Sequence, residues 1–295
     1  MRILVTGATG SHGSTGHLVA YFLLKENAQV RAMARREDGR AQILRDIGCE
    51  VVIADFHDLA SLRAAVRDVD ACYFSYPIRE GITIAAANVA LAAKENGVRS
   101  IVKNTMAVTM DLSPSPFARQ SFLAEQIFSW AGLTTVNLRS GFFFENLLRY
   151  SENEIIREGK IRWPLGSGET RMAWIAAQDV AMAACRMLRD QPKASETILL
   201  TGPDAFTFNE VADVCSTVLG KRVVYENAEE QDFFSRVNEI EGNNPMIVAH
   251  LKGLAGAFRA GKSFGKTTDD LLRLTEKRGV SLLEFLKTRL DMSQT

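Results

Sequence analysis

The sequence predicts an α/β fold built on a doubly wound parallel sheet, followed by a smaller and mainly helical region. The first observation is that the initial 140 residues alternate short apolar runs with longer amphipathic segments, as strands and their covering helices do. The second is a glycine cluster between the first apolar run and the first amphipathic segment. The third is that Asn96-Gly97 and Ala131-Gly132 each follow a helical run, where glycine commonly closes a helix.

Short apolar runs mark the predicted strands, which are Ile3–Thr6, Gln29–Ala34, Glu50–Ala54, Ala71–Ser75, Ser100–Lys103 and Thr134–Leu138. The segments between them carry apolar residues at helical spacing and predict helices at His17–Lys25, Gly39–Asp46, Leu59–Arg67, Ile82–Asn96 and Phe117–Ala131. Strands that alternate with helices in this way lie parallel, because each helix carries the chain back to the start of the next strand.

The regular alternation ends near Gly141. A turn at Trp163–Gly168 precedes a predicted helix at Gln178–Arg189 and a predicted strand at Thr197–Leu200. Further helical segments then follow one another without strands between them, at Asn209–Leu219, Glu230–Ile240, Pro245–Phe258 and Leu282–Leu290. We therefore expect one domain at 1–140, to which 167–200 returns, and a smaller region formed by 141–166 and 201–295.

Composition excludes several classes of function. Hydrophobic residues make up 46% and charged residues 24% of the chain, which is the balance of a folded globular protein. Lys plus Arg and Asp plus Glu both number 35, so there is no basic excess with which to bind nucleic acid directly. No stretch approaches the roughly 20 apolar residues of a membrane span, and the N-terminus does not resemble a secretory signal. We therefore expect no contact with a membrane.

The cysteines predict the compartment. Cys49, Cys72, Cys185 and Cys215 are scattered, without a Cys-x-x-Cys motif or a Cys/His cluster. Reduced and mostly buried thiols in a cytoplasmic protein are the expectation. The four histidines are also dispersed, so the sequence predicts no metal site.

The strongest functional signal lies directly between the first predicted strand and the first predicted helix. The chain reads Thr6-Gly7-Ala8-Thr9-Gly10-Ser11-His12-Gly13-Ser14-Thr15-Gly16 there. Glycines in this position allow a tight turn and a close approach of the backbone to a pyrophosphate, which the N–H groups of the helix N-terminus then bind. The loop predicts a Rossmann-type dinucleotide-binding domain, with candidate cofactor-binding residues Gly7, Thr9, Gly10, Ser11, His12, Gly13 and Gly16.

The end of the second predicted strand indicates which dinucleotide is bound. An acidic residue there would accept the ribose 2′-hydroxyl of NAD. The chain has Arg35 and Arg36 instead, whose guanidinium groups suit a 2′-phosphate, so we expect NADP(H) in preference to NAD(H). The alternative is that both arginines belong to a solvated charge cluster with Glu37-Asp38.

Residues at the ends of later strands complete the predicted cofactor site. Asp55 and Phe56 follow the third strand and are candidates for the adenine contact, with simple capping of the strand end as the alternative for Asp55. Tyr76 follows the fourth strand and Thr105 the fifth, and the carboxyl ends of parallel strands share the edge of the sheet where ligands bind. A strand-ending turn at Tyr76-Pro77 is the alternative for the tyrosine.

Several of these motifs occur together in a known family. They are Gly7-Ala8-Thr9-Gly10, Arg35 and Asp55 after successive strands, Ala131-Gly132-Leu133, Trp174-Ile175 with Gln178–Ala181, Gly202-Pro203, and above all Leu138-Arg139-Ser140-Gly141-Phe142-Phe143-Phe144-Glu145-Asn146. With these residues the chain is similar, over nearly its whole length, to the NmrA-like family of atypical short-chain dehydrogenases. That family includes NADPH-dependent quinone and dye reductases alongside redox-sensing regulators, so the resemblance implies one of these two activities.

The glycine loop departs from the pattern of that family. From Gly7 to the second strand the chain is roughly three residues longer, and the apolar spacing of the following helix fits best if Gly16 is the third motif glycine. Ser11, His12 and Ser14 would then add hydrogen-bond donors beside the pyrophosphate. A longer exposed loop that contacts nothing is the alternative.

The second departure concerns the proton donor. Short-chain dehydrogenases typically use a Tyr-x-x-x-Lys pair, but the only such spacing here, Tyr21 with Lys25, lies in the first helix, on the wrong side of the sheet for a nicotinamide site. In the resembled family a Lys or His precedes a helix glutamate by four positions, and alignment of that glutamate on Glu125 puts Ser121 there. The catalytic residues stay unassigned, with Ser121, Tyr76, Asn104 and Thr105 as candidates.

The substrate space is expected beside the smaller region, which we therefore call the substrate-side region. Its candidate lining residues are Met106, Phe142, Phe143, Phe144 and Asn146, with core packing as the favoured alternative for the three aromatics. We expect an oxidoreductase that transfers a hydride from NADPH to a quinone-like or unsaturated small molecule, which can take its proton from water. The alternative is a catalytically weak NADP(H)-sensing regulator that acts through a protein partner. A homodimer is compatible with both.

Overall fold

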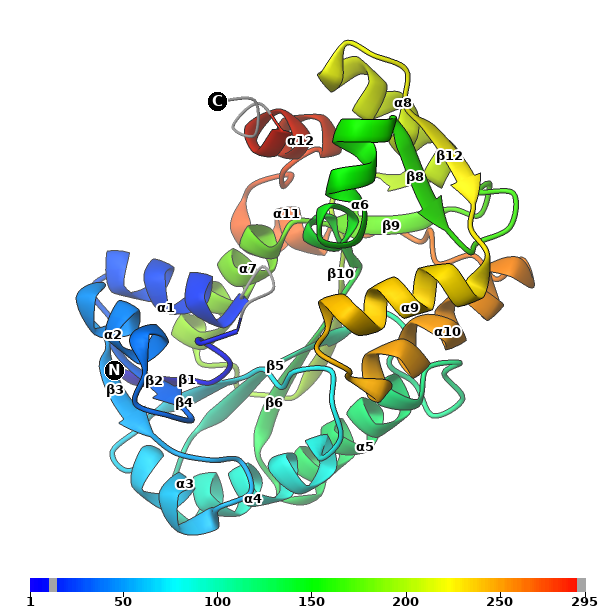
Figure 1. Ribbon diagram of the computed structural model, residues 1–295. Helices are drawn as coiled ribbons and strands as arrows, with labels where there is room; N and C mark the ends of the chain where they lie inside the picture. The colour runs from blue at the N-terminus through cyan, green and yellow to red at the C-terminus, as the bar shows by residue number, and fades with distance from the viewer. Residues whose placement is uncertain (11–14, 291–295) are drawn as a thin grey trace.

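The structure, a computed structural model, describes residues 1–10 and 15–290. Its centre is a parallel seven-stranded sheet with the strand order β10-β6-β5-β4-β1-β2-β3 (Figure 1). These strands are β1 (Arg2–Val5), β2 (Gln29–Ala34), β3 (Glu50–Ile53), β4 (Ala71–Phe74), β5 (Ser100–Met106), β6 (Thr134–Ser140) and β10 (Glu196–Leu200). The order of the strands reverses between β1 and β4, as it does in Rossmann-type sheets. The predicted fold class is confirmed.

Helices cover both faces of the sheet because successive side chains of a strand point to opposite faces. Along β1, Ile3 and Val5 pack under α1 (Thr15–Lys25) and α7 (Ala177–Asp190), whereas Leu4 faces the other side. That other side is covered by α3 (Leu59–Ala65), α4 (Ile82–Glu95) and α5 (Pro116–Trp130) (Figure 1). The helix α2 (Gly39–Asp46) follows β2 and packs near β3.

A second apolar core lies outside the sheet, around Trp163, Trp174 and Phe208. It is enclosed by α6 (Phe144–Glu158), α8 (Phe208–Leu219), α9 (Glu230–Ile240), α10 (Pro245–Arg259) and α12 (Leu282–Leu290), while α11 (Asp270–Thr275) packs on α7. Short strands join these helices, namely β8 (Lys160–Trp163) paired with β12 (Val224–Asn227), and β9 (Met172–Ile175) between β7 (Phe142–Phe143) and β11 (Ala205–Phe206).

Two expectations about this part of the chain were wrong. The segments after Asn209 do not follow one another without strands, because Val224–Asn227 forms β12 between α8 and α9. Its hydrogen bonds go to β8, more than 60 residues earlier, and no local pattern of the sequence announces such a pairing. The helix α6 was also missed, because its first residues belong to an aromatic run that also matches a buried strand.

The strand β5 is longer than expected, so Asn104, Thr105 and Met106 lie inside it and not after it. Their pairing with β6 continues to the last residue, where Met106 faces Ser140. Polar residues are tolerated in the middle of this sheet because Lys103, Asn104 and Thr105 each have a side-chain hydrogen-bond partner.

The described residues contain no helix that is long and apolar enough to cross a membrane. All four cysteines are buried free thiols, as expected. Burial raises the pKa of each thiol, to about 11 for Cys49. In the same described ranges no group of three His, Cys, Asp or Glu side chains is placed to hold a metal ion.

A buried hydrogen bond joins the two cores. Ser115, the N-cap of α5, accepts from the Ala118 N–H and lies 2.6 Å from Nδ1 of His250 in α10. Because the serine oxygen already accepts from the backbone, its hydroxyl donates to a neutral imidazole. Burial of His250 lowers its pKa to about 4. The same helix approaches closely at Gly253, where a Cβ would lie 2.3 Å from the Pro114 carbonyl oxygen.

We expect this histidine to make the protein less stable in mild acid. An unfolded histidine has a pKa of about 6.5, so between that value and pH 4 protons bind preferentially to the unfolded chain. The free energy of unfolding should therefore fall as the pH drops from 7 to 4, with a contribution of about 3 kcal/mol at most from His250. In His250→Asn the amide oxygen still accepts from Ser115 but does not titrate, so urea unfolding should show a shallower loss. Equal slopes for both proteins would contradict the assignment.

Candidate functional site

The backbone at the switch point of the sheet leaves room only for glycine. Ser75, just after β4, donates its N–H to Thr6 Oγ1 at 3.0 Å, and Thr6 Oγ1 lies 3.1 Å from the Tyr73 carbonyl oxygen. Gly7 has a φ of +70°, and a Cβ on it would lie 2.9 Å from the Ser75 carbonyl oxygen. The end of β1 is therefore clamped against the end of β4, at the position where Rossmann-type sheets bind their ligands.

A second close contact occurs at the start of α1. A Cβ on Gly16 would lie 2.7 Å from the Thr6 carbonyl oxygen and 2.8 Å from the Ala8 nitrogen. Close packing of helix on strand is the task of the third glycine of the dinucleotide-binding motif, so this contact favours Gly16 in that role. Gly10 N donates to Gly7 O at 3.2 Å and closes the turn between them. Ser11, His12, Gly13 and Ser14 lie outside the described residues.

The arginines at the carboxyl end of β2 are exposed and unpaired. Within residues 1–10 and 15–290, neither Arg35 nor Arg36 has a hydrogen bond or an ion pair. The neighbouring acids have other partners, since Glu37 pairs with Arg45 at 2.5 Å and Asp38 caps α2 and pairs with Arg40 at 2.6 Å. The two guanidinium groups are therefore available for an anionic ligand, and the mixed charge cluster with Glu37-Asp38 does not form.

Asp55, Phe56 and Tyr76 lie together at the ends of β3 and β4. The rings of Phe56 and Tyr76 are 5.2 Å apart, and the Tyr76 hydroxyl donates to the Glu80 carbonyl oxygen at 2.7 Å. Burial raises the pKa of Tyr76, while the Arg35 charge lowers it, which places Arg35 in the field of this group. Asp55 accepts from the His57 N–H at 2.9 Å with one carboxylate oxygen. Capping thus occupies one oxygen of Asp55, and the other has no hydrogen bond within the described residues.

The polar residues of β5 divide between the two faces of the sheet. Asn104 points toward α1, where its amide nitrogen lies 3.3 Å from Thr15 Oγ1. Lys103 and Thr105 point toward α5, where Lys103 Nζ donates to Ser121 Oγ at 2.7 Å and Ser121 Oγ lies 2.8 Å from Thr105 Oγ1. Two of the catalytic candidates, Ser121 and Thr105, are therefore in contact, whereas Asn104 lies on the opposite face. Tyr76 is in the separate aromatic group with Phe56.

Lys103 is the site residue that sequence analysis missed, since it was interpreted only as the end of a strand. Its side chain is fully buried, and burial lowers its pKa to about 8. Glu125 on α5 opposes this shift and Arg139 on β6 reinforces it, while these two residues pair with each other at 2.6 Å. A lysine inside a predicted central strand was the available signal, because lysine is almost never fully buried without a partner.

The aromatic run after β6 packs mainly into the second core. Phe144 is 1% exposed and its ring lies 5.9 Å from Trp174, while Phe142 lies 5.0 Å from the same ring. Phe143 is half-buried against the core under α1 and α7. Glu145 accepts from the Ala177 N–H at 3.0 Å and so caps the start of α7, and burial raises its pKa. The run therefore joins the second core to the sheet.

A cavity of about 400 Å³ lies between α6 and α9. Its lining includes Asn146, Arg149, Arg236 and Ile240, so it is polar and contains one of the predicted substrate residues. Asn146 lines this cavity, whereas Phe142 lines an apolar space of only about 20 Å³. Met106 is half-buried at the end of β5.

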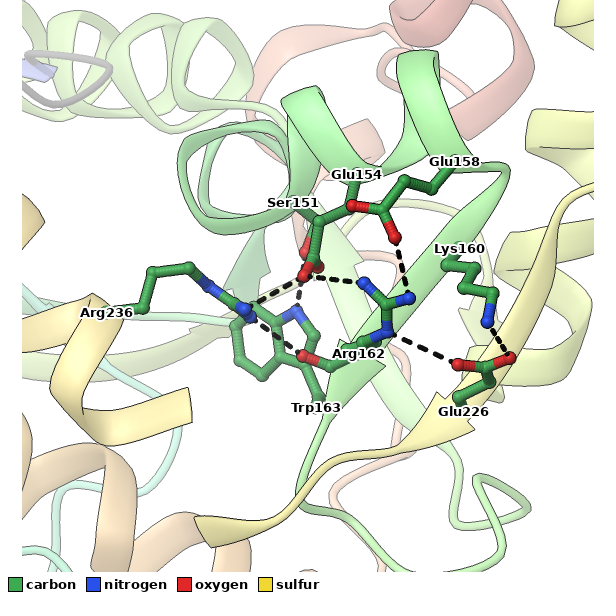
Figure 2. Close-up of polar contacts among 8 residues, drawn as sticks. All are labelled: Ser151, Glu154, Glu158, Lys160, Arg162, Trp163, Glu226 and Arg236. Carbon is green, nitrogen blue, oxygen red and sulfur yellow. Dashed lines mark hydrogen bonds and ion pairs between the residues drawn. The ribbon is translucent and has the colours of Figure 1, made fainter. Parts of the chain in front are cut away.

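Ion pairs hold the wall of this cavity in place. Figure 2 shows Glu154 of α6 accepting from Arg162 of β8 at 3.2 Å and from Arg236 of α9 at 2.8 Å. Arg162 also pairs with Glu158 at 2.7 Å and with Glu226 of β12 at 3.3 Å. The side-chain hydrogen bond from Glu158 raises the pKa of Arg162, so this guanidinium stays charged. The network joins four elements that are distant in the sequence.

Substitution of Gly16 tests the packing of the loop. We expect Gly16→Ala to lower the free energy of unfolding by about 1 to 3 kcal/mol, because the added methyl meets backbone atoms that cannot move aside. Gly39→Ala is the matched control, since a Cβ there meets nothing within 4 Å, and it should stabilise slightly or have no effect. Urea unfolding of both variants measures this. A Gly16→Ala protein as stable as the wild type would show that the helix start is not packed as described.

Comparison with known proteins agrees with this geometry. The NAD(P)H azoreductase of Xenophilus azovorans is 30% identical over 223 residues, which cover 76% of this chain and 76% of that protein. The NADPH-dependent quinone oxidoreductase of Escherichia coli, solved with NADPH, has a TM-score of 0.82 at 26% identity and covers 98% of this chain and 100% of its own. The triphenylmethane reductase of Citrobacter sp., solved with NADP(H), has a TM-score of 0.82 at 26% identity, with 97% and 99% covered. The chain matches the NmrA-like family over residues 1–284, and it belongs to that family.

Proposed function

We propose that the protein is an NADPH-dependent oxidoreductase that reduces a quinone-like or otherwise unsaturated small molecule by hydride transfer. The observation that carries this proposal is the pair of unpaired arginines at the end of β2, on the edge of the sheet where Gly7 and Ser75 form the switch point. The similar proteins named above, which include a quinone reductase, an azoreductase and a dye reductase, support the same class of reaction. We place the activity in the cytoplasm, on the strength of the buried free thiols.

The residues at the switch point fit a dinucleotide. The N-terminus of α1 and the loop from Gly7 to Gly16 would hold the pyrophosphate, and Arg35 with Arg36 would bind a 2′-phosphate. Asp55, Phe56, Tyr76 and Thr105, at the ends of neighbouring strands, would contact the rest of the cofactor. When bound, NADPH supplies the hydride, and the protein supplies orientation and the exclusion of water. NADP(H) is favoured over NAD(H) because the chain presents two cations and no acid at the end of β2.

The substrate is proposed to enter beside α6. The polar cavity with Asn146 lies there, and Met106, Phe142 and Phe143 come from the ends of β5 and β7 on the same side of the chain. The oligomeric state is left to experiment, with a homodimer compatible with the fold.

An NADP(H)-sensing regulator is the second candidate. The observation that favours it is Ser121, which occupies the expected position of a proton donor and whose hydroxyl does not ionise near neutral pH. A sensor must bind NADPH and NADP with different affinities, because a ligand shifts an equilibrium only through differential affinity.

Titration with nucleotides tests the cofactor assignment. We expect the purified protein to bind NADPH more tightly than NADH, and Arg35→Ala with Arg36→Ala to lose at least tenfold of that preference, since charge-assisted bonds to a phosphate contribute about 1.5 to 3 kcal/mol. Arg40→Ala is the matched control, because Arg40 is also exposed but is paired with Asp38. Binding is measured by calorimetry. An unchanged preference in the double variant would contradict the role of these arginines.

Turnover separates the two candidate functions. NADPH oxidation is followed with a quinone, an enone and a triarylmethane dye as acceptors. An oxidoreductase should consume NADPH with at least one of them, whereas a sensor should bind NADPH and NADP unequally and consume none.

A further inference from the structure

A continuous row of hydrogen-bonding groups runs from the middle of the sheet to its carboxyl edge. It begins at Lys103 Nζ, 2.7 Å from Ser121 Oγ, and continues over 2.8 Å to Thr105 Oγ1 and over 2.7 Å to Thr109 Oγ1. The Met106 N–H donates to the last hydroxyl at 3.4 Å. Each spacing is that of a direct hydrogen bond, so the row needs no water to be continuous.

The row has two proton arrangements. With a charged ammonium at Lys103, each hydroxyl donates outward, from Ser121 to Thr105 and from Thr105 to Thr109. With a neutral amine at Lys103, each hydroxyl reverses, and Ser121 donates inward to Nζ. Hydroxyl groups both donate and accept, so both arrangements satisfy the same heavy-atom positions.

Only one member of the row reaches the surface. Lys103 and Thr109 are fully buried and Ser121 is 1% exposed, whereas Thr105 keeps 7% of its surface exposed. Thr105 lies near the carboxyl end of β5, on the edge of the sheet where ligands of this fold bind. A proton that leaves the row toward a bound molecule would therefore leave from Thr105 Oγ1.

The surroundings of Lys103 keep both protonation states within reach. The ammonium has a single hydrogen-bond partner among the described residues, Ser121, although it has three N–H groups. Burial lowers its pKa to about 8, which lies close to neutral pH. The charged groups that face it are Glu125 on α5, which favours the charged form, and Arg139 on the neighbouring strand, which disfavours it.

We propose that Lys103 is the proton reservoir of the reductase, and that Ser121 and Thr105 relay its proton to the reduced substrate. This inference rests on the proposed function. The Nζ–H bond breaks as Ser121 Oγ takes that proton, the Ser121 proton passes to Thr105 Oγ1, and the Thr105 proton goes to the substrate oxygen that has become anionic. Lys103 is left as a neutral amine and regains its proton from water through the same row. Thr105 is the catalytic residue of this relay, and Lys103 and Ser121 act through it.

Two acceptors with different proton demands test the relay. A quinone takes a hydride and a proton, whereas a cationic triarylmethane dye takes a hydride alone and becomes neutral. We expect Thr105→Val and Lys103→Met to lower the ratio of quinone rate to dye rate by tenfold or more, since a positioned proton donor contributes about a hundredfold or more. Thr105→Ser restores the hydroxyl and should restore the ratio. Lys94→Met, on the exposed surface of α4, is the control.

The relay also predicts the pH profile. Because the charged form of Lys103 is the donor, the quinone rate should fall as the pH rises past about 8, while the dye rate should not follow this titration. With wild-type turnover of both acceptors, an unchanged rate ratio in Thr105→Val would overturn the relay. Equal slowing of both acceptors would also overturn it, because that result indicates a structural role.

A measurement without turnover keeps the two proposals separate. Protein labelled with ¹³C in its lysines shows the Lys103 signal by its loss in Lys103→Met, and we expect it to titrate near pH 8 without any cofactor. A Lys103 that stays charged above pH 10 would overturn the relay even if the reductase is active. If Lys103 titrates as expected but the wild type reduces no acceptor, the proposed function is wrong and the catalytic use of the row is wrong with it.

Discussion

The contact between the end of β1 and the end of β4 is the constraint on which the rest of the structure depends. Gly7 approaches Ser75 so closely that no side chain fits, and Gly16 brings α1 onto the same backbone. These contacts fix where the helix N-terminus lies relative to the ends of β2, β4 and β5. The unpaired arginines, the aromatic pair of Phe56 and Tyr76, and the hydroxyl of Thr105 come from those strand ends or from residues next to them. One backbone contact thus positions residues that are up to 100 residues apart in the sequence.

The second feature is a set of polar side chains in the middle of a parallel sheet. A buried lysine loses its hydration, which costs several kcal/mol unless partners replace the water. Lys103 has one hydrogen bond, to Ser121, and lies in the opposing fields of Glu125 and Arg139. An apolar residue would be less costly in a sheet whose neighbouring positions are otherwise apolar. The retention of a titratable group there is explained if it exchanges a proton with the edge of the sheet.

The fold was predictable because its signals are local. The glycine cluster after the first strand and the alternation of apolar runs indicate a doubly wound sheet, and β2, α2, α9 and α12 have the predicted bounds. The pairing of β8 with β12 was not predictable, since it depends on contacts between distant residues. The same distinction holds for the site. The arginines of β2 are visible as a sequence pattern, whereas the contact of Lys103 with Ser121 appears only when β5 and α5 are packed. The division into a sheet domain and a substrate-side region stays a prediction, as do the roles of the loop residues.

Transfer of a labelled hydride tests the central claim of a reductase most directly. NADPH that carries deuterium at the transferred position is incubated with the protein and a triarylmethane dye, and the reduced dye is analysed by mass spectrometry and NMR. The proposed function predicts one deuterium on the central carbon of the dye and a slower rate than with unlabelled NADPH. A reduced dye without deuterium, or no reduction of any acceptor by a protein that binds NADPH, would contradict it.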